Sequence, residues 1–201
     1  MTSDRLTRQI RFMVELDKVK RIVRRTELMD RSRFENDAEH SWHMSIMAGW
    51  LCEYATPRAP GSPPLDVLKV IKMCLIHDVV EIDAGDTYAY DPAAQAGKAD
   101  REQAAADRIF GLLPDDQAQN MRSLWNEFEA RHTPEAKFAA ALDRVQGVIN
   151  NYQAGGGSWQ AHAVTTAQVR QRIAPVQEGA PALWEYLNTL VDQATKNGWL
   201  L

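Results

Sequence analysis

Hydrophobic residues recur at steps of three and four along most of this chain, which is the spacing of amphipathic helices. No alternating β-branched pattern longer than a few residues interrupts them. The predicted helices are, approximately, Leu6–Arg25, Ala38–Tyr54, Leu65–Val80, Lys98–Leu113, Asp115–Arg131, Glu135–Ala154, Thr165–Ile173 and Ala182–Lys196. The pattern therefore predicts an all-α fold in which residues 1–201 form a single compact helical domain.

Two of these helices have faces that can be assigned from the pattern. The first carries an expected core face of Leu6, Ile10, Met13, Leu16, Val19 and Val23. Its basic side, which holds Lys18, Lys20, Arg21, Arg24 and Arg25, is expected to be solvated, with Arg25 as the exception. The second carries an expected inward face of Trp42, Ile46, Met47, Trp50, Leu51 and Tyr54.

Polar segments separate the predicted helices. The stretch from Thr26 to Asp37 has no clear period and is expected to be a loop, in which Asn36 or Asp37 caps the following helix. A second loop is expected from Thr87 to Gly97. Its aromatic residues, Tyr88 and Tyr90, fit packing and ligand contact equally well.

Composition narrows the functional classes. The net charge of −4 argues against a general nucleic-acid-binding protein, although local basic residues can still bind a small phosphorylated ligand. Cys52 and Cys74 lie in apolar surroundings and are expected to be reduced thiols. The first residues are polar, and no apolar run approaches the length of a membrane span. We therefore expect a cytoplasmic protein with neither a nucleic-acid nor a membrane partner.

The candidate chemistry lies where the most apolar helix runs into His77 and Asp78. Buried ionisable groups are costly unless they are paired or bound to a metal. His40 and Asp143, which lie in two other predicted helices, can complete a mixed nitrogen and oxygen site suited to Mn, Co, Fe, Zn or Mg. Simpler readings also fit the spacing: His77 and Asp78 can bond each other, His40 can lie on the surface, and Asp143 can pair with a neighbouring basic residue.

The order His40, His77-Asp78, Asp143 resembles the signature of the HD superfamily of metal-dependent phosphohydrolases. Residues 33–42 and 77–86 resemble the subgroup of bacterial 5′-deoxynucleotidases and related eukaryotic HD-domain 5′-nucleotidases. The resemblance implies an all-α fold, a divalent cation and a homodimer. It implies metal ligands at His40, His77, Asp78 and Asp143.

The same resemblance implies roles for further residues. Glu81 would be the acid/base carboxylate, and Asp86 would orient the water or the sugar. Arg25 would hold the phosphate, and the substrate-binding set would comprise Arg25, Asp78, Asp86 and Thr87. Thr26 stands where those enzymes carry a tryptophan that packs on the sugar.

The function implied is a 5′-nucleotidase that removes phosphate from (deoxy)nucleoside 5′-monophosphates by attack of a metal-activated water. Two alternatives remain open at this point, and a third, an oxygen-activating di-iron variant of the fold, is weakly disfavoured because the sequence shows only one His-Asp pair and few extra histidines. One is an HD hydrolase of another phosphorylated substrate, such as a nucleoside triphosphate, a cyclic nucleotide or an alarmone. The other is a metal-binding regulatory domain without catalysis.

Overall fold

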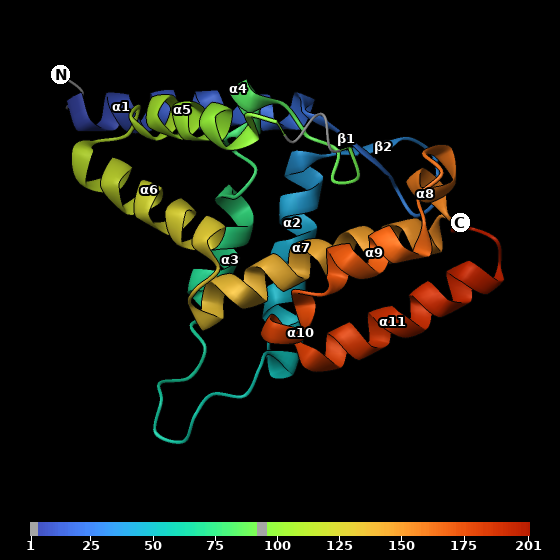
Figure 1. Ribbon diagram of the computed structural model, residues 1–201. Helices are drawn as coiled ribbons and strands as arrows, with labels where there is room; N and C mark the ends of the chain where they lie inside the picture. The colour runs from blue at the N-terminus through green and yellow to red at the C-terminus, as the bar shows by residue number, and fades with distance from the viewer. Residues whose placement is uncertain (1–3, 92–95) are drawn as a thin grey trace.

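Helices form most of the protein in the computed structural model, which describes residues 4–91 and 96–201 (Figure 1). The α-helices are α1 Asp4–Leu16, α2 Asp37–Leu51, α3 Val67–Ile76, α4 Glu81–Ala84, α5 Lys98–Phe110, α6 Asp115–Ala130, α7 Pro134–Gln153, α8 Gly157–Ala161, α9 Thr166–Ile173, α10 Val176–Gly179 and α11 Pro181–Lys196. Two 3₁₀ turns, Asp17–Arg21 and Cys52–Tyr54, follow α1 and α2. The predicted all-α class is confirmed. The single domain of residues 1–201 stays a prediction, and residues 92–95 of the expected loop lie outside the described part.

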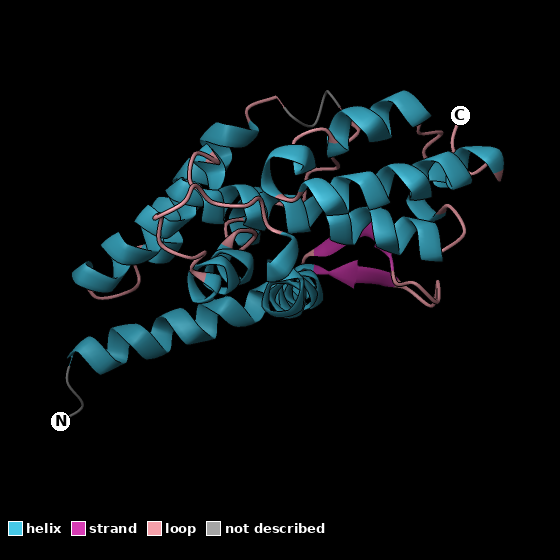
Figure 2. Ribbon diagram, turned by 90° about the horizontal axis from the view of Figure 1, so that it is seen from below, coloured by secondary structure: helices cyan, strands magenta, loops and turns pink. Residues whose placement is uncertain are grey.

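A small sheet replaces the end of the first predicted helix and part of the loop that follows (Figure 2). Strand β1, Val23–Glu27, pairs antiparallel with β2, Phe34–Asn36. The prediction of a helix as far as Arg25 was wrong, because α1 ends at Leu16. Pairing with the next strand along the chain satisfies the backbone here, and strand pairing of this kind overrides a local helical period.

The predicted core face of the first helix was largely wrong. Leu6, Ile10 and Met13 are 46%, 54% and 56% exposed, and Val23 on β1 is also exposed. The buried residue of α1 is Phe12, which packs in a cluster with residues of α5 and α6. An amphipathic pattern shows that a helix has an apolar stripe, but it does not show what covers the stripe.

The inward face of α2 was also assigned wrongly, except at Met47, which is buried, and at Leu51, which packs against the core. Trp42, Ile46, Trp50 and Tyr54 are exposed. The buried side of the helix is Asp37, His40, Ser41, Met44, Met47 and Ala48. These residues recur at three- and four-residue steps, so they share a face that combines polar groups with core residues. The polar groups belong to the site described below.

Two hydrophobic clusters flank that site. The larger is built around α7, which contacts α2, α3, α6, α9 and α11 and contributes Phe138, Leu142 and Val145. The smaller joins α1, α5 and α6 through Phe12, Phe110 and Trp125. None of the helices in the described ranges combines the length and apolarity needed to cross a membrane.

Candidate metal centre

The position of His40 follows from how α2 begins. Asn36 caps the helix, since its side-chain oxygen accepts a hydrogen bond from the backbone N–H of Glu39 at 3.0 Å. The Glu39 carboxylate accepts one in return from the backbone N–H of Asn36 at 3.2 Å. This reciprocal capping box fixes the first turn of the helix. His40 therefore points inward from that turn and is fully buried.

Helix α3 ends at Ile76, four residues before the predicted end at Val80. His77 and Asp78 follow it directly. Nδ1 of His77 lies 2.9 Å from the carbonyl oxygen of Cys74. The carbonyl of His77 accepts a hydrogen bond from the indole N–H of Trp125 at 3.1 Å. Because side chains bond two carbonyls that would otherwise continue the helix, the chain turns at this point. The prediction that helix continued to Val80 was therefore wrong.

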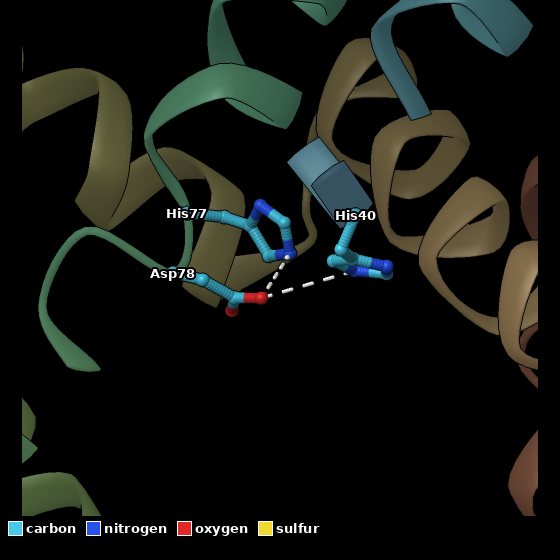
Figure 3. Close-up of side chains that lie close together, drawn as sticks. All are labelled: His40, His77 and Asp78. Carbon is cyan, nitrogen blue, oxygen red and sulfur yellow. Dashed lines mark ion pairs between the residues drawn. The ribbon is translucent and has the colours of Figure 1, made fainter. Parts of the chain in front are cut away.

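Three of the four expected ligands converge closely (Figure 3). Nε2 of His77 lies 3.1 Å from Oδ2 of Asp78, and Nε2 of His40 lies 3.8 Å from the same oxygen. Asp143, on α7, places Oδ1 at 3.3 Å from Nε2 of His40. Residues from three distant parts of the chain thus surround one point. Their role as metal ligands stays a prediction.

The ring nitrogens of His40 and His77 that make no hydrogen bond in the described part of the chain fit the binding of a cation. Each imidazole uses Nδ1 inside the protein, His40 towards Gln146 at 3.0 Å and His77 towards Cys74. Nε2 of both rings is buried and makes no hydrogen bond within the described residues. Both Nε2 atoms face carboxylate oxygens, and imidazole nitrogens beside carboxylates suit divalent transition metals.

The charged groups around His40 shift one another's pKa values. Burial and Arg24 lower the pKa of His40, but the adjacent carboxylates of Asp143 and Glu35 outweigh them and raise it to about 9. Burial opposes ionisation of Asp143, yet the adjacent His40 ring and the charge of Arg172 hold its pKa well below the usual range. Asp143 therefore stays ionised, as a carboxylate must be in order to bind a metal.

The expected catalytic and substrate-binding residues line one pocket beside this centre. Its walls include Arg25, Asp78, Glu81, Asp86 and Thr87. Glu81 starts α4, so it does not share a continuous helix with His77 as expected from the sequence. It still lies against the site, and burial together with Asp78 and Asp37 raises its pKa well above the usual range. The structure brings these residues together, but it does not test their roles.

Sequence reasoning missed several basic residues of the same pocket. Lys98, Arg144 and Arg172 line it, and Arg172 donates to Oδ2 of Asp143 at 3.2 Å. Arg24 was expected on a solvated face, but its guanidinium is buried and lies 2.7 Å from Oδ2 of Asp78. Arg24 was missed because the chain was predicted to be helical as far as Arg25. Arg24 lies instead in strand β1, where successive side chains point to opposite sides.

A family model described as HD domain matches residues 16–184, which includes all of these site residues. The chain belongs to the HD domain family. Other members of this family can therefore be compared with this protein.

A crystal structure of a predicted metal-dependent phosphohydrolase from Magnetospirillum magnetotacticum MS-1 is similar throughout. It is 48% identical, has a TM-score of 0.90, and the match covers 98% of this chain and 95% of the other. The 5′-deoxynucleotidase HDDC2 of Danio rerio is 29% identical over 59% of this chain and 55% of its own length. The human protein of that name is 28% identical over 58% and 53%. The chain thus spans little more than half of these curated relatives.

Proposed function

We propose that this protein is a metal-dependent phosphohydrolase that removes phosphate from nucleoside 5′-monophosphates. The observation that carries the proposal is the pair of buried, unbonded Nε2 atoms of His40 and His77 beside Asp78 and Asp143. They lie against a pocket whose lining includes several arginines and a lysine beside its carboxylates. HD-family membership and the names of the relatives support the same reaction class.

His40, His77, Asp78 and Asp143 would hold the divalent cation. When bound, it would supply a Lewis acid for the phosphate and a water of lowered pKa. Nitrogen and oxygen ligands without thiolate leave Mn, Co, Mg, Fe and Zn as candidates.

The chain's own residues would perform the rest of the work. Arg25, Lys98 and Arg172 bring positive charge to the pocket, where they can bind the phosphate oxygens. Glu81, with Oε2 free of hydrogen bonds, would donate a proton to the leaving 5′-oxygen. Asp86 and Thr87, which line the same pocket, would orient the sugar.

Phosphate release from a panel of ribo- and deoxynucleoside monophosphates tests the proposal, with Mn, Co and Mg added after chelation. We expect Asp78→Ala to abolish release and Arg25→Ala to weaken it strongly. Asp83→Ala is the matched control, because Asp83 is an exposed carboxylate that pairs with Arg108. Full activity of the Asp78 variant would contradict the proposal. Turnover of only a triphosphate, cyclic nucleotide or alarmone would retain a phosphohydrolase with another substrate, and metal binding without turnover would indicate a regulatory domain.

We also propose a homodimer. Trp42, Ile46 and Trp50 form an exposed apolar stripe along α2 at one-turn spacing. Contiguous apolar surface of this kind is typical of an interface, and a second copy of the chain would cover it. A cytoplasmic location and the lack of a nucleic-acid partner stay predictions.

A further inference from the structure

Arg24 reaches from β1 into the carboxylates beside the metal centre. Its Nη1 donates to Oδ1 of Asp37 at 3.0 Å and to Oδ2 of Asp78 at 2.7 Å. Its Nε lies 3.8 Å from Oε2 of Glu35. Only 17% of the Arg24 side chain is exposed. The guanidinium is therefore a fixed internal cation.

The carboxylates around Arg24 have the arrangement of a second cation site. One oxygen each of Asp37, Asp78 and Glu81 lies within 4.8 Å of the others. Oδ2 of Asp37 and Oε2 of Glu81 are buried and make no hydrogen bond within the described residues. Asp78 belongs both to this group and to the group with His40 and His77. A carboxylate shared between two neighbouring groups is the usual bridge of a two-metal centre.

We propose that the guanidinium of Arg24 takes the place of a second metal ion in the Asp37, Asp78 and Glu81 cluster, so that the centre binds one divalent cation per chain. This inference rests on the proposed function, because it assumes that the first cation binds at His40, His77, Asp78 and Asp143.

Charge balance explains why Arg24 would exclude a second ion. A divalent cation among these oxygens would lie beside the guanidinium, and like charges repel strongly at short range in a buried site. Arg24 cannot leave easily, since three carboxylates surround it and its backbone belongs to the sheet. A guanidinium is not deprotonated in proteins, even when it is buried. It thus stays charged at any working pH.

Metal stoichiometry tests the inference without any activity assay. The purified protein is freed of metal with a chelator, saturated with Mn²⁺, and measured by elemental analysis and by electron paramagnetic resonance. We expect one Mn²⁺ per wild-type chain, with the spectrum of an isolated ion. Arg24→Met keeps a side chain of similar length without the charge. We expect it to bind two ions per chain, with the spectrum of a coupled pair.

Matched variants separate this effect from a general loss of charge. Arg25→Met removes the adjacent cation, which lines the outer pocket, and should still bind one ion. Arg24→Met combined with Asp37→Asn removes a ligand of the new site and should also return to one ion.

Two coupled ions in the wild-type protein would overturn the inference even if no variant folds. A single ion in a folded Arg24→Met variant would overturn it as well. Both of these results would leave the first metal centre intact. No bound ion in the wild type would instead contradict the proposed function itself, and this inference with it.

Discussion

Nδ1 of His40 lies 3.0 Å from the side-chain oxygen of Gln146, and both groups are buried. The amide nitrogen of Gln146 donates to Oε1 of Glu35 at 2.7 Å. Because the amide N–H points at the carboxylate, the amide oxygen faces His40 and must accept its Nδ1–H. In the neutral ring, the proton on Nδ1 leaves Nε2 as the free lone pair, directed towards Asp143 and Asp78. Glu35 therefore sets the tautomer of His40 through Gln146.

Gln146→Leu should weaken divalent metal binding about 10- to 100-fold, which is the usual cost of losing a hydrogen bond that orients a metal-binding histidine. Without the amide oxygen, the ring of His40 can rotate or carry its proton on Nε2. Titration of the metal-free protein with Mn²⁺ against a competing chelator measures the change. Gln153→Leu is the control, since Gln153 is exposed on the same helix. Equal affinities for a folded Gln146 variant and the wild type would show that Gln146 does not position His40.

The histidines and acids of the site could be predicted from sequence, whereas the residues that hold them could not. His77, Asp78 and Asp143 were detectable because ionisable groups in apolar helices need partners. Gln146 also lies in an apolar stretch, but a glutamine there gives no sign of which histidine it will meet. Arg24 was hidden because the β1–β2 pairing depends on residues on both sides of a turn.

Helices could be located from periodicity more reliably than their buried faces could be chosen. The pattern placed α7 and α11 within one or two residues of their observed bounds. It turned α2 the wrong way, because Trp42 and Trp50 are more apolar than His40 and Asp37. The observed orientation places the polar residues inside, where they pair with Arg24 and Asp143.

Cys74 should resist alkylation in the folded protein, whereas Cys52 should react. Cys74 has no exposed surface, and burial, with a further contribution from Asp143, raises the pKa of its thiol to about 12. Thiolate is the reactive form, so very little is present at pH 8. Cys52 is only partly buried. Mass spectrometry after iodoacetamide treatment, with and without urea, gives the modified fraction of each residue. Rapid labelling of Cys74 without urea would show that α3 opens readily.

Gly179→Ala should destabilise the protein by about 1–3 kcal/mol, the usual cost of overpacking a close contact. A Cβ at Gly179 would lie 2.4 Å from the backbone carbonyl oxygen of Lys137, so α10 would have to move away from α7. Gly49→Ala is the opposite control, because a Cβ there meets nothing within 4 Å inside α2. Its better helix propensity should add up to about 1 kcal/mol. Urea unfolding followed by circular dichroism measures both values, and equal stabilities for the two variants would contradict the tight packing of α10.

Trp50→Glu should convert the proposed dimer to a monomer. Trp50 is 74% exposed and Trp42 is 63% exposed, so the α2 stripe would contribute large aromatic surfaces to an interface. A carboxylate in that interface would be buried without a partner, and the two-fold axis would bring a second copy of it into the same interface. Analytical ultracentrifugation over a range of concentrations measures the association. Tyr186→Glu tests whether the location matters, since Tyr186 is 51% exposed on a different helix, α11. Loss of the dimer only in the Tyr186 variant would move the interface to α11, and a monomeric wild type would contradict the dimer altogether.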